Sequence, residues 1–489
     1  MGTTMLKHLI HGKRTKVIAT LGPASNSKEI IEQMIIQGVD VVRLNASHHR
    51  DPSVYKKMVQ TVRKVAKKAH RHVSIFLDLQ GPKIRVGKIK KGTRLNAGDS
   101  VILTSNPLVG TAETVYINYP SLVQDLNLGD PIYIDDGRIC LEVTQKEKEH
   151  LCANVKVGGE LSDYKGVNFP NTTMSTSPIT EKDQKDIQGA IAAKVDYIAL
   201  SFVSDPEDIV ELRGILDQSK AKGIRIIAKI ERPQAVEQLS AIIKLADAVM
   251  VARGDLGVEI GVEKVPKIQK RIIRNCNRHL TPVIVATQML ESMIHSEVAT
   301  RAEVSDVANA IYDLCDAVML SGETAIGVNP VNVIKVISQI CKESDHHVNA
   351  IRNEEQTQLS SIVSTHARTS SFCIAAEQIA IENNATAIMT FTSSGSTPLF
   401  TSKLSAILPI LAPTDNELVC SQMALYRGVI PIMMGTKFSK IHRWTDMIHV
   451  AVKEAKALSL LKTGDIIVVT AGIPIGKSQG TNSIRLIEI

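Results

Sequence analysis

Two stretches of the sequence, IRIIAKIE at Ile224–Glu231 and DAVMVARGDL at Asp247–Leu256, are short apolar runs that end in charged residues. Continuous apolar runs, rather than alternating ones, are typical of parallel strands that are covered on both faces. Six further runs of this kind begin at Thr15, Val39, Val73, Val195, Thr281 and Asp316. Helical patterns lie between most of them. Eight such units predict a (β/α)8 TIM barrel, with an open doubly wound sheet as the alternative.

The pattern changes between Val86 and Pro170, where short alternating runs are separated by Gly and Pro turns. This pattern predicts a small β-barrel domain inserted into the larger barrel, where it can act as a lid over the active-site face. Beyond Pro330, further strand-like and helical segments predict a C-terminal α/β domain. We therefore expect barrel segments at 1–82 and 179–345, an inserted lid domain at 83–178 and a C-terminal regulatory domain at 346–489.

The composition argues against several classes of protein. The net charge is only +7 and aromatic residues make up 3% of the chain, which disfavours stacking-based nucleic-acid binding. In the basic run Tyr55–His72 the apolar residues recur at helical spacing, so we expect a solvated amphipathic helix there. The 7 cysteines form no CxxC pair, and the chain shows neither a signal-peptide core nor a membrane-spanning apolar run. We expect a cytoplasmic protein with no membrane association.

Polar and charged side chains fall at or near the carboxyl ends of the predicted strands. They are Arg43, Asn45, Ser47, Asp78, Ser201, Lys229, Glu231, Arg253, Asp255, Thr287, Ser321 and Glu323. Barrel active sites are built from these positions, because parallel strands point their carboxyl ends at one shared face. A single Ser or Thr there can simply cap a helix. The group of charges at the ends of apolar strands instead predicts a site, because buried charges must pair or bind a ligand.

Glu231 and Asp255 end adjacent predicted strands, so we expect their carboxylates to converge. Two hard oxygen ligands with room for water and substrate suit Mg²⁺. Arg43, Arg85 and Lys229 predict a phosphorylated, anionic substrate, and the text after Asp255 can begin a helical turn whose free N–H groups bind a carboxylate. This set favours phosphoryl transfer or enolate chemistry.

Three other features of the sequence have a local interpretation. In FLDLQGPKIR (Phe76–Arg85) the carboxylate of Asp78 is followed closely by Lys83 and Arg85, which fits either a solvated salt-bridge turn or an anion site. GIPIGKS, from residue 472 to 478, is similar to a P-loop but has three residues between its glycines and a strand after it, so we expect no nucleotide cradle. The paired histidines at 48–49 and 346–347 lack further ligands, which disfavours zinc.

Several long strings closely resemble the pyruvate kinase family, in its order along the chain. They are VVRLNASH, LDLQGPKIR, IIAKIERPQAV, MVARGDLGVEI, VIVATQMLESMI, TRAEVSDVANAI and MLSGETA. The resemblance covers essentially the whole chain. It implies transfer of a phosphoryl group from phosphoenolpyruvate to ADP, giving pyruvate and ATP in glycolysis.

The resemblance also implies roles for individual residues. Glu231 and Asp255 match the ligands of Mg²⁺ or Mn²⁺, and Lys229 matches the lysine that stabilises the transferring phosphoryl group and the enolate. Thr287 and Ser321 match residues of proton delivery, with Thr287 relaying a proton through water. The substrate carboxylate would lie on the backbone of Ala252, Gly254 and Asp255. Phosphate-binding and nucleotide-side positions are matched by Arg43, Arg85, Asn45, His48 and Lys182.

Two departures from the common family pattern lead to finer expectations. The K⁺ ligands of many members correspond to Asn45, Ser47, Asp78 and the carbonyl of Leu79, but this chain has Lys83 where those members carry glutamate, as in the branch that works without K⁺. The ammonium of Lys83 would then act as a tethered cation. The family's effector-phosphate loop corresponds to Thr392, Ser393, Ser394, Gly395, Ser396 and Thr397. Here Ser396 replaces an arginine, and the loop from residue 471 to 482 lacks the Trp and Arg associated with fructose 1,6-bisphosphate, so we expect a sugar monophosphate such as ribose 5-phosphate. We expect a homotetramer.

Two alternatives stay open at this point. A metal-dependent aldolase or lyase that works through a pyruvate enolate could use the same strand ends, although the inserted domain favours a kinase. A catalytically silent metabolite sensor would show no Mg²⁺-dependent turnover. A phosphotransfer assay set against a retro-aldol screen separates these possibilities.

Overall fold

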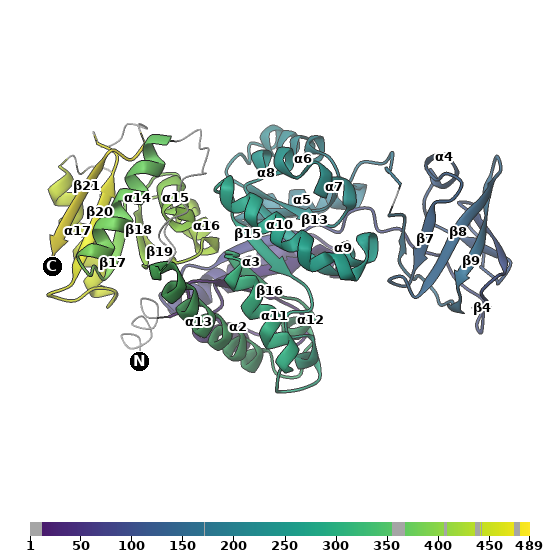
Figure 1. The fold of residues 1–489 in the computed structure, drawn as a ribbon, viewed down its shortest axis with the longest axis horizontal. Helices are drawn as coiled ribbons and strands as arrows, with labels where there is room; N and C mark the ends of the chain where they lie inside the picture. The colour runs from purple at the N-terminus through teal and green to yellow at the C-terminus, as the bar shows by residue number, and fades with distance from the viewer. Residues whose placement is uncertain are drawn as a thin grey trace.

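The structure is a computed structural model that describes residues 12–170, 172–354, 367–404, 408–435, 441, 443–473 and 480–489. Three bodies follow one another along the longest axis of the molecule (Figure 1). A barrel lies in the middle, the inserted domain lies on one side of it, and the C-terminal domain lies on the other side (Figure 1).

The central body is a closed barrel of parallel strands, which confirms the predicted TIM barrel over the open sheet. Its strands follow one another around the barrel in the order β1-β16-β15-β14-β13-β12-β3-β2. They are β1 (Lys16–Thr20), β2 (Val41–Asn45), β3 (Ser74–Asp78), β12 (Tyr197–Val203), β13 (Arg225–Ile230), β14 (Ala248–Ala252), β15 (Val283–Ala286) and β16 (Ala317–Leu320). Nearly every strand residue is buried, because helices cover the outside and side chains fill the interior.

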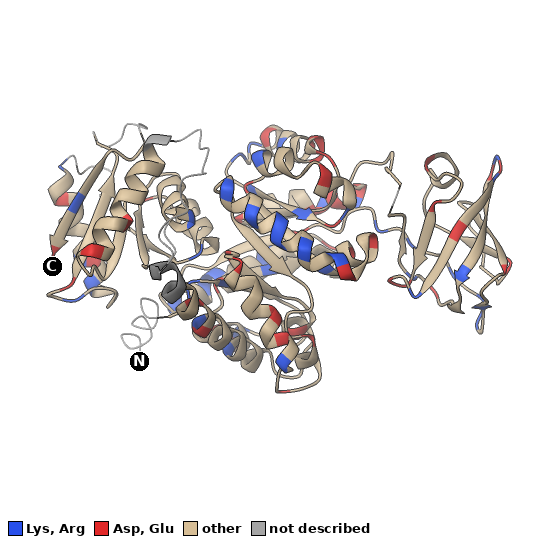
Figure 2. Ribbon diagram, in the orientation of Figure 1, with Lys and Arg blue, Asp and Glu red and all other residues tan. Residues whose placement is uncertain are grey.

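Helices cover the outside of the barrel. They are α2 (Lys28–Gln37), α3 (Val54–Lys68), α5 (Glu181–Ala193), α6 (Pro206–Gln218), α7 (Pro233–Glu237), α8 (Leu239–Leu245), α10 (Val265–Arg278), α11 (Arg301–Tyr312) and α13 (Pro330–Glu354). The helix α3 shows why the basic run folds here: Tyr55, Val59, Val62, Val65 and Ala66 are buried on one face, as the spacing predicts, and the cations lie on the other. Basic residues also recur along the ribbon of α10 (Figure 2).

The inserted domain leaves the barrel after β3 and returns before α5. It contains β4 (Arg94–Leu95), β5 (Ser100–Thr104), β6 (Thr114–Tyr116), α4 (Leu122–Asp125), β7 (Pro131–Ile134), β8 (Ile139–Lys146), β9 (His150–Val157), β10 (Gly159–Glu160) and β11 (Val167–Asn168). Six strands form one sheet in the order β11-β7-β8-β9-β5-β6, and β10 pairs with β4. Single bridges join Arg85 to Gly166 beside β11, and Val86 to Ile117 beside β6. The segment that enters the domain therefore links the two edges of its sheet.

The C-terminal domain is an α/β layer structure. Its helices are α14 (Ala367–Glu382), α15 (Ser396–Leu404), α16 (Glu417–Gln422) and α17 (Trp444–Ala457). Its strands are β17 (Ala387–Thr390), β18 (Ile410–Thr414), β19 (Val429–Met433), β20 (Ile466–Ala471) and β21 (Ser483–Glu488), in the order β19-β18-β17-β20-β21. Among the described strands of this sheet, β21 alone is antiparallel to its neighbour.

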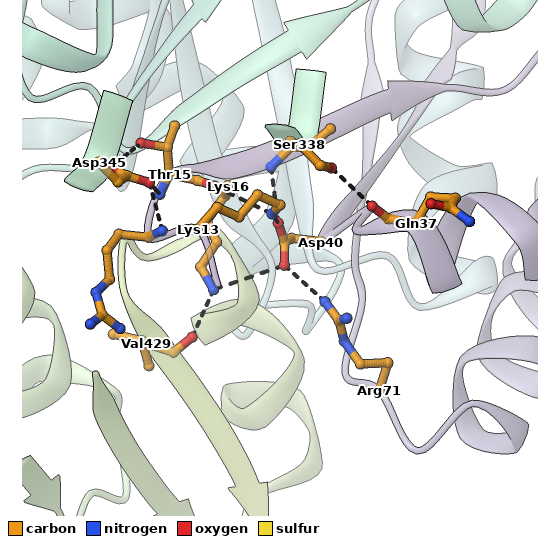
Figure 3. Close-up of polar contacts among 11 residues, drawn as sticks. Lys13, Thr15, Lys16, Gln37, Asp40, Arg71, Ser338, Asp345 and Val429 are labelled. Atoms are coloured by element: carbon orange, nitrogen blue, oxygen red, sulfur yellow. Dashed lines mark hydrogen bonds and ion pairs between the residues drawn. The ribbon is translucent and has the colours of Figure 1, made fainter. Parts of the chain in front are cut away.

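A buried charge cluster joins the barrel to this domain (Figure 3). Asp40 pairs with Lys13 and with Arg71, whose Nη2 lies 3.1 Å from Oδ1. Lys16 lies 3.9 Å from the same carboxylate and donates to the carbonyl of Val429 at 2.7 Å. One acid thus faces three cations, and one of these cations reaches across to β19.

Within the part of the chain that the structure describes, no helix is both long and apolar enough to span a bilayer.

Candidate active site

Lys229 lies at the centre of the candidate site, near the carboxyl end of β13. Its ammonium is 2.9 Å from Oε1 of Glu231 and 3.2 Å from Oδ1 of Asp78, and it donates to the hydroxyl of Ser201 at 2.6 Å. The side chain is 11% exposed. Burial acts to lower the pKa of Lys229, but Asp78 and Glu231 outweigh burial and raise this pKa above its ordinary value. The ammonium therefore keeps its charge in a buried position.

Asp78 ends β3 and is held by two cations. Nη2 of Arg43 and Nζ of Lys229 lie 2.7 Å and 3.2 Å from its oxygens. Burial would raise the pKa of Asp78, but Lys229 and Arg43 outweigh burial and lower it. Arg43, on β2, also donates to the hydroxyl of Thr20 at 3.2 Å. The structure thus brings Arg43, Asp78 and Lys229 together from three strands.

Glu231 follows β13 and is buried, whereas Asp255 lies in the first turn of α9 (Arg253–Ile260) and is exposed. Burial, opposed by Lys229 and assisted by Asp255, raises the pKa of Glu231 to about 7. Oε2 of Glu231 accepts from the backbone N–H of Phe202 at 2.7 Å. Among the described residues Oε1 accepts no hydrogen bond of good geometry, although the ammonium of Lys229 lies 2.9 Å away.

These two carboxylates fit a hard divalent cation. The oxygen Oε1 of Glu231 has the ammonium of Lys229 as its neighbour at 2.9 Å and could still coordinate a cation with a second lone pair, and an added positive charge would favour the ionised form of a carboxylate whose pKa is raised. Across the described ranges, no three His, Cys, Asp or Glu side chains gather into a metal-binding group. A cation held by Glu231 and Asp255 would therefore leave coordination positions for substrate and water.

The helix α9 begins earlier than the sequence indicated. It starts at Arg253, directly after β14, rather than after Asp255, so Gly254 and Asp255 belong to its first turn. The N–H of Gly254 donates to the hydroxyl of Thr287 at 2.9 Å. This contact places Thr287, which follows β15, against the backbone segment that was predicted to bind a carboxylate.

Ser321 follows β16 and begins the short helix α12 (Gly322–Ala325). Its N–H donates to Oε2 of Glu323 at 2.7 Å, and Oε1 of the same buried carboxylate accepts from the N–H of Leu290 at 3.1 Å. Glu323 therefore joins the ends of β15 and β16.

The other predicted residues of β2 and its surroundings lie beside this cluster. Asn45 accepts from the N–H of Ser47 at 3.1 Å and so caps the short 3-10 helix η1 (Ala46–His48). Burial, then Arg43 and Lys83, lowers the pKa of His48. Lys182, on α5, donates to the carbonyl of Ala46 at 2.8 Å. Lys182 also pairs with Asp186 at 2.6 Å.

The monovalent-cation positions and the chain around Lys83 have specific partners. The carbonyl of Leu79 accepts from the hydroxyl of Ser201 at 2.8 Å. Lys83 is exposed, and its ammonium forms no ion pair with any residue that the structure describes. Partial burial and Arg85 nevertheless lower the pKa of Lys83, with Asp255 acting in the opposite direction. The guanidinium of Arg85 donates to the carbonyl of Tyr164 at 3.1 Å, within the inserted domain.

The predicted effector loop follows β17 and includes the first two residues of α15. The N–H of Gly395 donates to the hydroxyl of Thr392 at 2.8 Å, and the hydroxyls of Ser394 and Ser396 are 3.0 Å apart. Arg225, at the start of β13, donates to the carbonyl of Ser394 at 2.8 Å. Most of the neighbouring loop, residues 474–479, including most of the P-loop-like stretch, lies outside the described residues.

Sequence reasoning gave no role to three residues that organise this site. Ser201, Arg253 and Glu323 were predicted only as strand-end polar residues, but each contacts residues of the site. Ser201 links Lys229 to Leu79, Arg253 contacts the carbonyl of Thr287, and Glu323 contacts Ser321. Their positions at the ends of apolar runs were the available signal, but this signal identifies no partner.

Comparison with known proteins gives one consistent result. The family model described as the barrel domain of pyruvate kinase matches residues 12–334, and the model of its alpha/beta domain matches residues 370–487. A pyruvate kinase of Geobacillus stearothermophilus is 40% identical over 484 residues, which cover 97% of this chain and 80% of the relative. A pyruvate kinase of Staphylococcus aureus (strain USA300) is 41% identical over 483 residues, with the same coverage of 97% and 80%.

A solved structure agrees with the sequence comparisons. The crystal structure of a pyruvate kinase from Cryptosporidium parvum superposes with a TM-score of 0.91 at 33% identity, covering 98% of this chain and 96% of the other. The matched regions include the barrel with its strand-end cluster, the inserted domain and the C-terminal sheet. The chain therefore belongs to the pyruvate kinase family.

Proposed function

We propose that this chain transfers the phosphoryl group of phosphoenolpyruvate to ADP in glycolysis, giving pyruvate and ATP. The observation that carries this proposal is the buried ammonium of Lys229, held among Asp78, Glu231 and Ser201 at the carboxyl end of the barrel. A permanent cation in a site with few water molecules stabilises charge that develops on a transferring phosphoryl group. Arg43, which lies 2.7 Å from the same Asp78, adds a second positive charge beside it.

Glu231 and Asp255 would hold Mg²⁺ or Mn²⁺, as the family generally does. When bound, the cation neutralises negative charge on the phosphate and on the enolate oxygen. Lys229 stays protonated, because the neighbouring carboxylates raise its pKa, and so it can face the phosphoryl group. The N–H of Asp255, at the start of α9, suits the substrate carboxylate, whereas the N–H of Gly254 already donates to the hydroxyl of Thr287.

The second half of the reaction protonates the enolate at its methylene carbon. We propose that Thr287 relays this proton through water, with Ser321 assisting, because a threonine hydroxyl is too weak an acid to be the source itself. The hydroxyl of Thr287 has both a donor and an acceptor partner: it receives the N–H of Gly254 at 2.9 Å and donates to the carbonyl of Ala286 at 2.6 Å. A hydroxyl held in this way can orient a water molecule.

The test is ATP formation from phosphoenolpyruvate and ADP, run beside a retro-aldol screen for pyruvate release from 4-hydroxy-2-oxo acids. We expect Mg²⁺-dependent ATP formation and no retro-aldol activity. Glu231→Gln should lower turnover by at least about 10²-fold, whereas the exposed neighbour Glu237→Gln should not. Retro-aldol turnover without ATP formation would support the lyase alternative, and no turnover at all would support the sensor.

We infer that the nucleotide lies between the barrel and the inserted domain. Asn45, His48 and Lys182 surround the end of β2, and Arg85 begins the inserted domain. This inference uses the proposed domain division, with barrel segments at 1–82 and 179–345, a lid at 83–178 and a regulatory domain at 346–489. The boundary at residue 345 falls inside helix α13, which continues to Glu354. Arg85→Met should raise the KM for ADP more than that for phosphoenolpyruvate.

We further propose that the enzyme works without K⁺, with the ammonium of Lys83 in place of that cation. The charges that act on the Lys83 ammonium are those of Arg85, Asp255, Lys229 and Asp136, and two of these, Asp255 and Lys229, belong to the candidate site. Turnover should be nearly equal in K⁺ and in tetramethylammonium at equal ionic strength. Lys83→Glu with Leu79→Thr should lose activity and regain part of it with K⁺, whereas the exposed Lys91→Glu should behave as the parent. A parent enzyme that needs K⁺ for most of its turnover would refute the proposal.

For regulation, we propose that a sugar monophosphate such as ribose 5-phosphate binds the loop from Thr392 to Thr397. Hydroxyls and N–H groups of this loop suit phosphate, and the guanidinium of Arg225 lies against its backbone. Titrating ribose 5-phosphate and fructose 1,6-bisphosphate against phosphoenolpyruvate saturation tests this. Ser396→Asp should abolish activation by repelling phosphate, and strong activation by fructose 1,6-bisphosphate would contradict the proposal.

We also propose a cytoplasmic homotetramer. Val298, Ile326 and Val328 are 73%, 62% and 63% exposed, and such apolar side chains on neighbouring loops suit a subunit contact. The seven cysteines are free, which suits a reducing compartment. Light scattering of the parent and of Val298→Asp with Val328→Asp would measure the assembly, and a monomeric parent would contradict it.

A further inference from the structure

The chain after β15 adopts an unusual backbone conformation. Thr287 and Gln288 have φ angles of +70° and +52°. Residues other than glycine rarely adopt this left-handed region, and a β-branched threonine there is an outlier that costs free energy. The surrounding structure must therefore hold Thr287 in place.

Arg253 makes the contacts that hold it. Its Nε lies 3.2 Å from the carbonyl oxygens of both Ala286 and Thr287, and its Nη2 donates to the carbonyl of Thr287 at 2.5 Å. The remaining nitrogen, Nη1, pairs with Asp306 at 2.6 Å. The guanidinium side chain is only 10% exposed, so the fork is fixed by its partners.

These contacts fix the direction of the Thr287 hydroxyl. With its carbonyl held by Arg253, the hydroxyl meets the N–H of Gly254 at 2.9 Å. Gly254 is the next residue after Arg253 in the first turn of α9. The same residue therefore orients the proposed proton relay and lies beside the backbone that is proposed to bind the substrate carboxylate.

We propose that Arg253 is a positioning residue for the proton-transfer half of the reaction and acts through Thr287 without touching the substrate. This inference rests on the proposed function, in which the P–O bond of phosphoenolpyruvate breaks and the enolate carbon then gains a proton from water. A guanidinium is required, because a lysine ammonium lacks the planar fork that contacts two adjacent carbonyl groups and a carboxylate.

The experiment measures the two half-reactions separately in the full chain. ATP formation from phosphoenolpyruvate reports the whole forward reaction, and exchange of the methyl protons of pyruvate in D₂O, with Mg²⁺ and ATP present, reports proton transfer by proton NMR. Arg253→Met and Arg253→Lys should each lower the exchange at least about tenfold, with the KM for phosphoenolpyruvate changed less than twofold. The matched control is Arg213→Lys, because Arg213 also pairs with an aspartate, Asp247, outside the site. It should leave the exchange unchanged.

A double-variant comparison separates positioning from general structural damage. If Arg253 acts through Thr287, Arg253→Met should have little further effect on exchange in a Thr287→Ala background. Equal, additive losses in both backgrounds would overturn the inference, as would normal exchange in Arg253→Met. The proposed function fails separately: the parent would then form no ATP, or Thr287→Ala would exchange protons normally. Circular dichroism of each variant identifies misfolding, and the conservative Arg253→Lys keeps the charge if Arg253→Met does not fold.

Discussion

Ser201→Ala is a small change with a large expected effect, because the Ser201 hydroxyl links two parts of the site. It accepts a hydrogen bond from the ammonium of Lys229 at 2.6 Å and donates one to the carbonyl of Leu79 at 2.8 Å. The substitution removes one of the three polar partners of a buried cation and leaves the carboxylates of Asp78 and Glu231, at 3.2 Å and 2.9 Å. The ammonium would then shift toward these two acids and away from the proposed phosphoryl position.

The size of the effect follows from the charge of the donor. Hydrogen bonds to charged groups contribute roughly 1.5–3 kcal/mol, and each 1.4 kcal/mol is about tenfold in rate. We therefore expect kcat/KM for phosphoenolpyruvate to fall about 10- to 150-fold in Ser201→Ala, and to recover in large part in Ser201→Thr, which restores the hydroxyl.

Steady-state kinetics of ATP formation provides the assay, and Ser204→Ala serves as the matched control. Ser204 lies in the same segment, but its hydroxyl contacts only the carbonyl of Phe202, at 3.3 Å, among the described residues. The control should stay within about twofold of the parent. If Ser201→Ala also keeps its kcat/KM within twofold, the hydroxyl does not position Lys229 and the reasoning is refuted.

Three further predictions concern charge. Asp255→Asn should lower Mg²⁺-dependent ATP formation by at least about 10²-fold, measured over a Mg²⁺ titration, and normal turnover would remove Asp255 from the metal site. Asp40→Asn should lower the free energy of unfolding by roughly 3–5 kcal/mol in urea at pH 7, because three buried cations lose the acid that they share. Folding lowers the pKa of Asp40, so this stabilisation is present above the pKa of Asp40 in the unfolded chain and is lost as the pH falls through its pKa in the folded chain. A free energy of unfolding that does not decrease at acid pH would contradict the prediction. Burial lowers the pKa of Lys16 from 10.5 to about 8, so between these pH values the folded chain has released a proton that the unfolded chain still holds. The free energy of unfolding of the parent, relative to that of Lys16→Met, should therefore rise as the pH increases from about 8 to 10.5.

The fold was predictable because its signal is local. Each barrel strand is buried on both faces, so it reads as an unbroken apolar run, and the end of each run marks the carboxyl end of a strand. For this reason the run at Ile224–Glu231 predicted β13 and also predicted Lys229 and Glu231 as neighbours in a site. The start of α9 was mispredicted by three residues, because Arg253, Gly254 and Asp255 follow an apolar strand and no capping side chain marks the start of a helix there.

The partners of each residue were not predictable, because they depend on how the strands are staggered around the barrel. Lys83 and Arg85 follow Asp78 closely in the sequence, but in the structure Asp78 forms ion pairs with Arg43 and Lys229. The register explains this: Asp78 lies opposite Asn45 on β2 and opposite Ala199 on β12. A shift of this stagger would change every partner without altering any apolar run. The positive φ of Thr287 was equally hidden, since a β-branched residue gives no signal for that conformation.

Two hydrogen bonds link the inserted domain to the segments that carry Glu231 and Asp255. Arg232, the residue after Glu231, donates to the carbonyl of Thr172 at 2.8 Å, where the inserted domain returns to the barrel. Asn168, in the last strand of that domain, donates to Glu259 on α9 at 2.9 Å, four residues beyond Asp255. Each of the two segments that carry a proposed metal ligand is therefore fastened to the returning chain. The inserted domain thus contacts the barrel beside both proposed metal ligands, one residue after Glu231 and four residues after Asp255.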